Sequence, residues 1–200
     1  MSQATPAFPD AKIMNEAGMP PVVEARLAGS GKVLVDETRS QDELRTKGFG
    51  EKEDAEYVLK AYEALYLMNT KRLVLKGRKE MTFDSLFDML VKYDRNIMTK
   101  FLVYRDLRSR GYVAKEGFGF GNDFRVYERG EYEKKPAKYV IFGINEGTNI
   151  TARSFLQAIE QIEKMGKEAV VAVIERRGEV IYYKASKMRF IENKYRQNNA

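Results

Sequence analysis

The sequence predicts an α/β protein, because stretches in which apolar residues recur every three or four positions alternate with short runs of β-branched residues. The composition is globular: of the 200 residues 44% are hydrophobic, 12% aromatic and 32% charged. The pattern changes near residue 93, which indicates two compact halves. We therefore expect a small N-terminal α/β domain at 21–93 and a C-terminal domain at 94–190, with a flexible tail at 1–20 and a basic tail at 191–200.

The N-terminal half is expected to alternate strands and helices. Three of the five prolines fall in the first twenty residues, which indicates a tail without regular structure. Apolar offsets of three and four predict a helix at 51–68, and the acidic residues at its start suit the positive end of the helix dipole. Thr82 is placed to cap a second helix at 83–93. Short apolar runs predict strands at 32–36 and 73–75.

The C-terminal half begins with a helix and continues mostly as strands. The helix at 95–109 is predicted to end at Gly111, because glycine accepts the left-handed conformation that often follows a helix. A second helix is predicted at 152–164 by the same apolar spacing. Alternating or β-branched runs predict five strands, the last two joined by a hairpin-like turn. These strands are 112–115, 124–127, 138–144, 169–174 and 180–183.

The chain contains neither cysteine nor histidine, and this excludes several kinds of chemistry within it. Disulfides, thiolate zinc sites and catalysis by an imidazole are ruled out. A carboxylate site for Mg²⁺ or Mn²⁺ is the metal site that stays open. No apolar run approaches the length of a membrane span, and the first residues lack the pattern of a secretory signal. We therefore expect a cytoplasmic protein without a membrane contact. No cofactor is expected.

Basic residues are concentrated in one part of the chain. The net charge is +6, and the segment 71–110 holds eleven lysines and arginines against five acidic residues. Arg105, Arg108 and Arg110 lie on nearly one side of the predicted helix with tyrosines near by, an arrangement that can form a groove for an RNA backbone. The alternative is a solvated helix face, because charge also serves solubility alone.

Three further features have both a structural and a functional interpretation. The segment 117–121 has glycine at every second position and looks like a phosphate-binding loop. No helix follows it, however, which favours a hairpin with packed phenylalanines. Tyr127 ends an alternating strand, where a tyrosine usually packs, and Lys167 follows a helix, where the dipole favours a lysine. Taken alone, these residues describe a basic α/β protein that can bind nucleic acid.

The run from Phe101 to Tyr127 resembles the archaeal tRNA-intron (tRNA-splicing) endonuclease family. That family carries the pattern YRDLRSRGY…GFKFG…FRVY, and this chain has YRDLRSRGY, GFGFG and FRVY in the same order. The resemblance extends over about residues 48–185 and implies a C-terminal mixed-sheet, nuclease-like domain of the tRNA-splicing endonuclease type. Further matches in order are 63–67, 137–140, 167–175 and 178–183.

The resemblance implies a nuclease that needs no metal. In the family a tyrosine, a histidine and a lysine act at the bulge-helix-bulge of precursor tRNA. The ribose 2′-OH attacks the adjacent phosphate, which leaves a 2′,3′-cyclic phosphate and a 5′-OH. The tyrosine acts as base, the histidine as acid, and the lysine stabilises negative charge in the transition state. Tyr127 and Lys167 match the tyrosine and the lysine, but the histidine position holds Pro136, which has no proton to donate.

Two more departures from the family concern RNA. Glu160 stands where the family has an arginine that grips the bulged RNA, and Gly119 stands where GFKFG has its lysine. A carboxylate repels phosphate, so the change at Glu160 weakens such a contact. Together with Pro136, these departures imply the structural subunit of a two-chain (αβ)₂ enzyme, which positions a separate catalytic paralogue on precursor tRNA.

The resemblance also implies which residues meet that partner. In the family, the turn between the last two strands carries acidic residues that enter a basic cleft of the opposing subunit. Glu175 and Glu179 occupy the matching positions. The last strand, with Val180 and Tyr182, would pair with its equivalent in the catalytic subunit and bury a sheet edge.

Two other interpretations stay open. The chain could be an active member of the family in which a lysine, or a group of a partner, replaces the histidine, because Tyr127 and Lys167 are retained. It could also be an RNA-binding adaptor that has left splicing, because the basic segment remains while the acid is lost. Co-purification with a second endonuclease-like chain would argue against the adaptor.

Overall fold

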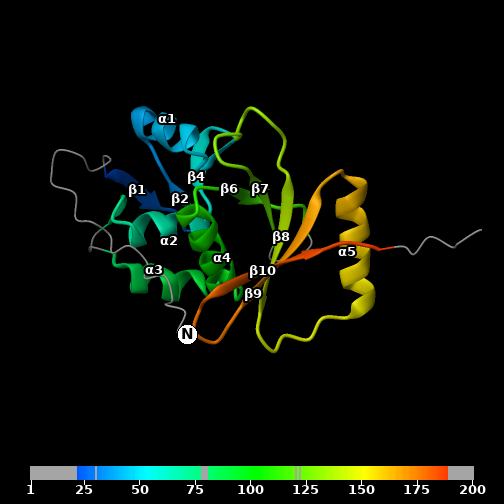
Figure 1. The fold of residues 1–200 in the computed structure, drawn as a ribbon. Helices are drawn as coiled ribbons and strands as arrows, with labels where there is room; N and C mark the ends of the chain where they lie inside the picture. Colours follow the sequence, from blue (N-terminus) through cyan, green and yellow to red (C-terminus); the bar gives the residue numbers. More distant parts are fainter. Residues whose placement is uncertain (1–21, 30, 78–80, 120, 122, 189–200) are drawn as a thin grey trace, which may run out of the picture.

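The computed structural model describes residues 22–188 except 30, 78–80, 120 and 122, so the predicted tails at 1–20 and 191–200 lie outside the described residues. Within this part, the chain forms two five-stranded sheets and five α-helices (Figure 1). This mixture of strands and helices confirms the predicted α/β class.

The N-terminal sheet consists of short strands in the order β3-β4-β2-β1-β5. Only β1 and β5 pair in parallel, and the other pairs are antiparallel. Its strands are β1 (Val23–Leu27), β2 (Val33–Leu34), β3 (Glu51–Glu53), β4 (Glu56–Leu59) and β5 (Leu73–Lys76). The same half contains the helices α1 (Thr38–Thr46), α2 (Ala61–Asn69) and α3 (Phe83–Leu90).

The C-terminal sheet is mixed, as expected, and has the order β10-β9-β8-β7-β6. Its strands are β6 (Val113–Glu116), β7 (Asp123–Tyr127), β8 (Tyr139–Asn145), β9 (Glu168–Ile174) and β10 (Val180–Ala185). The parallel pair β8 and β9 is joined by helix α5 (Ala152–Lys164), the crossover that a parallel connection requires. All five predicted strands of this half are confirmed to within one or two residues.

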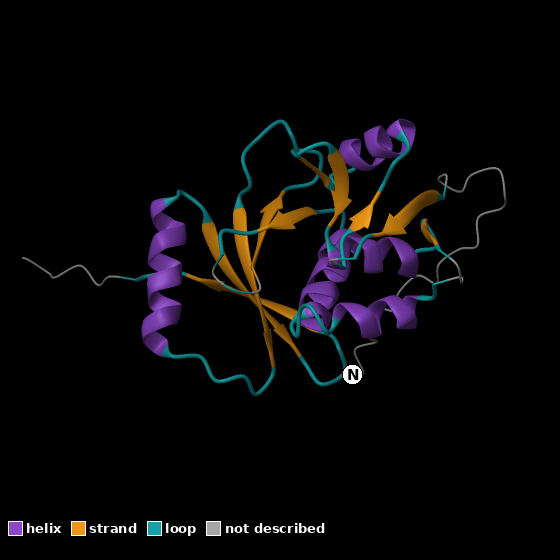
Figure 2. Ribbon diagram, turned by 180° about the vertical axis from the view of Figure 1, so that it is seen from behind, coloured by secondary structure: helices purple, strands orange, loops and turns teal. Residues whose placement is uncertain are grey.

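Helices cover both faces of the C-terminal sheet. Helix α4 (Ile97–Ser109) lies on the side of the N-terminal half, and α5 stands alone on the opposite flank (Figures 1 and 2). The α5 side is held by a small apolar cluster in which Ile159 and Ile162 meet Val140 and Ala169. Strand β10, at the margin of this sheet, is only partly buried.

The prediction of a helix at 51–68 was wrong in its first half. Residues there form the antiparallel pair β3 and β4, joined by a tight turn in which Asp54 has a φ of 52°. The three residues at 57–59 are all buried, which a fully covered strand requires but a helix also permits. Helix α2 begins only at Ala61, and its first turn is capped by the carboxylate of Glu63, which accepts a hydrogen bond from the backbone N–H of Lys60 at 3.0 Å.

The remaining elements of the N-terminal half differ less from the prediction. Thr82 caps α3 as expected, with its hydroxyl accepting from the N–H of Ser85 at 3.3 Å, although the helix ends at Leu90 and not at 93. Two elements were not predicted, β1 and α1. Helix α1 buries only Ser40 and Leu44, so its sequence carries little apolar periodicity.

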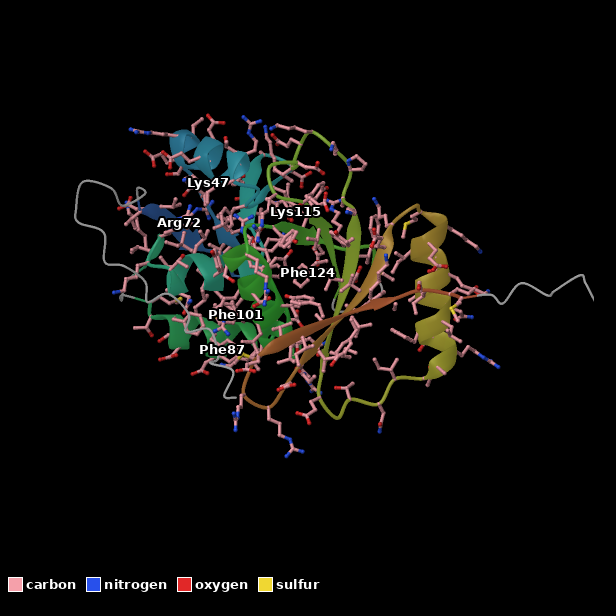
Figure 3. All side chains as sticks on the ribbon, viewed as in Figure 1. Lys47, Arg72, Phe87, Phe101, Lys115 and Phe124 are labelled. Carbon is pink, nitrogen blue, oxygen red and sulfur yellow. The ribbon has the colours of Figure 1, made fainter. Side chains whose placement is uncertain are left out.

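A continuous core joins the two halves. Tyr62 of α2 packs against Tyr104 of α4 at 4.9 Å between ring centroids and edge-on against Phe124 of β7 at 5.1 Å. Beside these rings, the ammonium group of Lys115 on β6 donates to the carbonyl of Gly50 at 2.6 Å and pairs with the buried carboxylate of Glu63 at 3.4 Å. Lys115 and Phe124 are labelled in Figure 3 where the halves meet. The boundary near residue 93 therefore separates two sheets but not two cores.

Candidate active site and subunit interface

The ends of three neighbouring strands bring the candidate catalytic positions together on one side of the C-terminal sheet, where these strands begin or end. Strand β7 ends at Tyr127, β8 begins just after Pro136, and β9 begins just after Lys167. The N–H of Lys138 donates to the carbonyl of Val126 and the N–H of Glu168 donates to the carbonyl of Lys138, both at 3.0 Å. These two bonds fix the three strand ends side by side.

Tyr127 and Pro136 line one surface hollow of about 340 Å³. Tyr132 stands edge-on to Tyr127 with 5.1 Å between ring centroids. The ammonium group of Lys167 donates to the carbonyl of Ala137 at 2.7 Å, directly beside Pro136. The structure thus brings the three predicted positions together, and the proline is the member of this group that has no titratable side chain.

Two lysines near Pro136 are already engaged with carboxylates. Lys135 donates to Glu131 at 2.5 Å, and Lys138 donates to Glu128 at 2.6 Å. The hydrogen bond from each lysine to its carboxylate is the largest cause that raises its pKa above the ordinary value. A raised pKa makes a lysine a weaker acid at neutral pH, so neither side chain is suited to protonate a leaving oxygen.

Two residues of this region were missed by the sequence reasoning. Tyr132 packs on Tyr127, and burial raises the pKa of its hydroxyl, which therefore stays protonated. Arg125 lies two positions before Tyr127 on β7, so both side chains point to the same face of the sheet. The Nε of Arg125 is buried and has no hydrogen-bond partner among the described residues. The period of two along β7 is the sequence signal that could have identified Arg125.

The three arginines predicted to bind RNA are spread along α4 and just beyond its end, and each makes contacts within the chain. Arg105 lies over the ring of Phe101 at 5.5 Å, and Arg108 donates to the carbonyl of Lys47 at 2.8 Å. The Nε of Arg110 donates to Asp106 at 2.7 Å. Their role in RNA binding stays a prediction.

Glu160 and Gly119, the two positions at which the sequence departs from the family's RNA contacts, do not line the hollow that contains Tyr127 and Pro136. Glu160 on α5 pairs with Lys187 at 2.5 Å, so its carboxylate has a cation beside it. Gly119 has a φ of 89°, and a side chain there would meet no atom within 4 Å. The first carbon of a side chain would therefore have room at this position, but the backbone holds a conformation that favours glycine.

The acidic hairpin predicted to meet a partner joins β9 to β10. It is closed by a hydrogen bond from the N–H of Glu175 to the carbonyl of Glu179 at 2.9 Å. Strand β10 is the last strand of its sheet, so one row of its backbone groups faces outward. An edge of this kind is suited to pairing with another chain.

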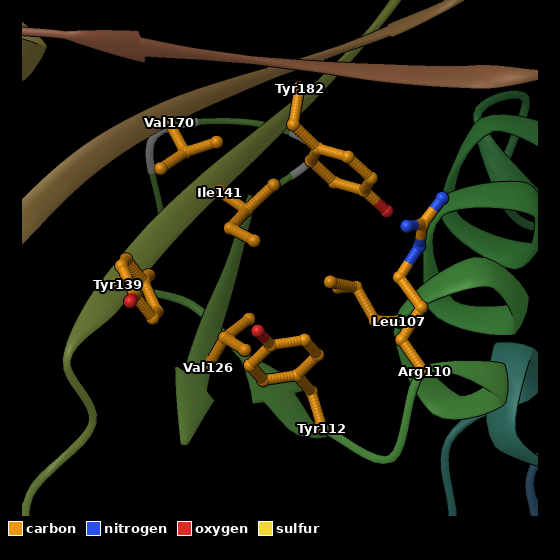
Figure 4. Close-up of a pocket in the computed structure, with 8 residues that line it drawn as sticks. All are labelled: Leu107, Arg110, Tyr112, Val126, Tyr139, Ile141, Val170 and Tyr182. Atoms are coloured by element: carbon orange, nitrogen blue, oxygen red, sulfur yellow. The ribbon is translucent and has the colours of Figure 1, made fainter. Parts of the chain in front are cut away.

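The side chains of β10 point alternately inward and outward. Val180 and Tyr182, predicted at the interface, turn toward α4, where Tyr182 donates to Asp106 at 2.7 Å. Tyr182 lines a cavity of about 240 Å³ between α4 and the sheet (Figure 4). The outward residues are Ile181 and Tyr183, which are 37% and 55% exposed. The outer surface of this edge is therefore apolar.

Two properties of the described residues complete the description of the site. No helix among them is long and apolar enough to cross a membrane. Within the same residues, no group of three or more acidic side chains is arranged to hold a metal ion.

Comparison with known proteins assigns both halves of the chain to one family. Residues 97–182 match the family model of the tRNA intron endonuclease catalytic C-terminal domain, and residues 23–87 match that of its N-terminal domain.

Several archaeal relatives named tRNA-splicing endonuclease align over nearly their whole length. That of Thermococcus onnurineus is 32% identical over 169 residues, which cover 84% of this chain and 98% of the relative. The relative from Pyrococcus furiosus is 29% identical over 174 residues, covering 86% and 100%, and that from Methanococcus maripaludis is 29% identical, covering 80% and 92%. From its two matched domains and these relatives, the chain belongs to the tRNA intron endonuclease family.

Proposed function

We propose that the chain is a structural subunit of a tRNA-splicing endonuclease and that it positions a separate catalytic subunit. The complete enzyme would cut introns from precursor tRNA at bulge-helix-bulge sites and leave 2′,3′-cyclic phosphate and 5′-OH ends. One observation carries the proposal: Pro136 stands beside Tyr127 and Lys167 at the point where the family has its proton donor. The leaving 5′-oxygen would have no acid to protonate it.

The size of this defect decides between a slow enzyme and a structural subunit. General acid catalysis contributes on the order of 10²–10⁴ in rate, so a site without its acid is at least a hundredfold weaker. The ion pairs of Lys135 and Lys138 argue against substitution by either of these neighbours. The acidic Glu160 in place of an RNA-gripping arginine weakens the site further.

The partner proposed for this chain is a catalytic paralogue in an (αβ)₂ heterotetramer, acting in the cytoplasm. Strand β10 offers an open backbone edge, and Ile181 and Tyr183 offer an apolar surface beside it. The hairpin with Glu175 and Glu179 projects next to this edge and would supply negative charge to a basic cleft of the partner. Arg105, Arg108 and Arg110 would contribute to binding precursor tRNA.

The test compares the chain alone with the chain plus its histidine-bearing partner. A bulge-helix-bulge RNA is incubated with each in the presence of EDTA, and the 5′-OH and cyclic-phosphate products are followed by gel electrophoresis. We expect cleavage only when both chains are present, because only the partner has the acid. Efficient cutting at both intron borders by this chain alone would refute the proposal.

A second candidate function is supported by the retained pair Tyr127 and Lys167. Lys167 is held in place by the carbonyl of Ala137, as a transition-state cation would need to be. If the chain is an active member that uses another acid, Tyr127→Phe and Lys167→Ala should each lower the rate of the complete complex by about tenfold or more. Full activity of both variants would mean that these residues only pack.

A further inference from the structure

Arg72 carries a half-buried charge without a counter-ion at the start of β5. Its guanidinium lies over the ring of Phe49 at 5.4 Å from the centroid. Its Nε is buried and has no hydrogen-bond partner among the described residues, and no described carboxylate lies within 4.0 Å of it. Burial is the largest cause that lowers the pKa of Arg72, which expresses the cost of keeping this charge away from water.

A second guanidinium lies on the same aromatic ring. Arg108, near the end of α4, stands 4.0 Å from the centroid of Phe49 and donates to the carbonyl of Lys47 at 2.8 Å. The positive charge of Arg108 also lowers the pKa of Arg72, although less than burial does. Two like charges thus converge on Phe49, a residue that is itself fully buried. Figure 3 labels Lys47 and Arg72 on this side of the molecule.

The charge of Glu43 acts on Arg72, but the two side chains form no ion pair within the described part of the chain. The charge of Glu43 raises the pKa of Arg72 slightly, but its carboxylate pairs with Arg39 at 4.0 Å along α1. Lys47 and Lys71 are exposed beside the two arginines and add to the positive charge. A half-buried charge without a partner is costly, and proteins usually meet that cost with a bound counter-ion or with water.

We propose that Arg72 and Arg108, with Lys47 at the rim, form a binding site for a phosphate group of an RNA backbone. The planar fork of arginine donates two parallel hydrogen bonds to a phosphate, and an aromatic ring beneath it limits the rotation of the fork. RNA is favoured over an acidic protein segment because the family processes tRNA and because the segment 71–110 is strongly basic. The site lies outside the hollow of Tyr127 and does not depend on which subunit cuts.

The experiment measures RNA binding by this chain alone, with a fluorescein-labelled tRNA transcript and anisotropy at several salt concentrations between about 0.05 and 0.2 M. Arg72→Gln removes the charge, Arg72→Lys keeps it, and Lys92→Gln removes an exposed charge just beyond α3. We expect Arg72→Gln to weaken binding about three- to tenfold and to lower the slope of log K against log salt by about one, while Lys92→Gln changes neither. Arg72→Lys should retain most of the slope.

Thermal unfolding separates this role from a structural one. Removing an unpaired half-buried charge should leave the melting temperature of Arg72→Gln unchanged or higher, so weaker RNA binding could not follow from unfolding. Unchanged affinity and salt slope in Arg72→Gln would overturn the proposal. The proposal would also be overturned if Arg72→Gln kept its RNA affinity but weakened association between protein chains in sedimentation. The anion bound by Arg72 would then be a carboxylate of another protein chain. No cleavage and no partner is needed, so this outcome is independent of the proposed subunit role.

Discussion

Pro136 leaves the strand-end site without a proton donor at that position, although the backbone framework of the site is complete. The backbone bonds that align β7, β8 and β9 involve Val126, Lys138 and Glu168, and none of them uses the side chain at Pro136. Tyr127 and Lys167 keep their places around it. On the proposed function, proton donation is therefore the first property that a substitution at Pro136 should restore.

Pro136→His should give this chain measurable cleavage of a bulge-helix-bulge RNA. An imidazole with an ordinary pKa near 6.5 is a suitable acid near neutral pH, and we expect the rate to rise about tenfold or more above wild type. The rate should fall as the pH rises above that value, because the acid must be protonated. Pro136→Ala is the matched control, since it removes the ring without adding a donor. Equal rates for the two variants would show that more than the acid is missing.

The buried ion pair between Glu63 and Lys115 is the contact whose loss should affect stability. The side chain of Glu63 is fully buried and accepts backbone hydrogen bonds from Gly50 at 2.9 Å and Lys60 at 3.0 Å. Lys115→Met leaves the carboxylate without its cation, and we expect a loss of about 3–5 kcal/mol in the free energy of unfolding. Urea unfolding measures it, and Glu63→Leu combined with Lys115→Met should recover much of the loss. A loss under about 1 kcal/mol for Lys115→Met would show that the pair contributes little.

The pH dependence of stability should report Glu63 directly. Burial is the largest cause that raises its pKa above the ordinary 4.5, against the opposing attraction of Lys115. The folded state therefore holds a proton that the unfolded state releases, and stability falls as the pH rises above 4.5 through the folded pKa. Glu63→Gln should flatten this decline, and Lys115→Met should steepen it. Denaturant midpoints between about pH 4 and 8 provide the measurement.

At the scale of the element, strand β10 combines a free backbone edge with an apolar outer surface. Ile181→Lys places a charge on that surface, where lysine is known to oppose strand pairing. We expect it to weaken association with the proposed catalytic partner by about tenfold or more in analytical ultracentrifugation, with an unchanged melting temperature. Val74→Lys on β5 is the control, since Val74 is similarly exposed at 46% but belongs to the other sheet. Equal weakening by both variants would place the interface elsewhere.

Elements were predictable from the sequence where local pattern and tertiary packing agree. Helix α5 has its predicted bounds because its apolar stripe, Ile159 and Ile162, coincides with the face that packs on the sheet. The error at 51–68 arose because buried Tyr57, Val58 and Leu59 continue the apolar spacing of α2 through a strand. Only Lys60, in an extended conformation, separates β4 from α2, so the sequence carries no clear turn signal between the strand and the helix.

The sequence named three positions of the candidate site, whose role stays a prediction, but it did not name their surroundings. The resemblance assigned Tyr127, Pro136 and Lys167, and the structure brings them to one sheet edge. The unpartnered Arg72 could not be foreseen, because its contacts with Phe49 and Arg108 come from segments far apart in the sequence. Local pattern does not determine which charges in a basic segment find partners.

At the scale of the whole molecule, one core holds two sheets. Tyr62 of the N-terminal half covers Tyr104 and Phe124 of the C-terminal half, so a fragment of residues 94–200 would expose both rings. Burial of aromatic side chains contributes several kcal/mol, which is comparable with the roughly 5–15 kcal/mol net stability of a domain. The boundary predicted near residue 93 should therefore not mark an independently folding unit.

We expect the fragment 94–200 to lack a cooperative thermal transition and a native near-ultraviolet circular dichroism spectrum when it is made alone. Co-expression with residues 1–93 should restore both, because α2 then packs again on α4 and β7 and Glu63 regains Lys115. Phe83→Ala is not expected to abolish the reconstitution, since this side chain is only partly buried at the margin of the core. A sharp, reversible transition in the isolated fragment would mean that the C-terminal sheet and α4 are sufficient to fold, and that the contacts across the seam only orient the N-terminal half.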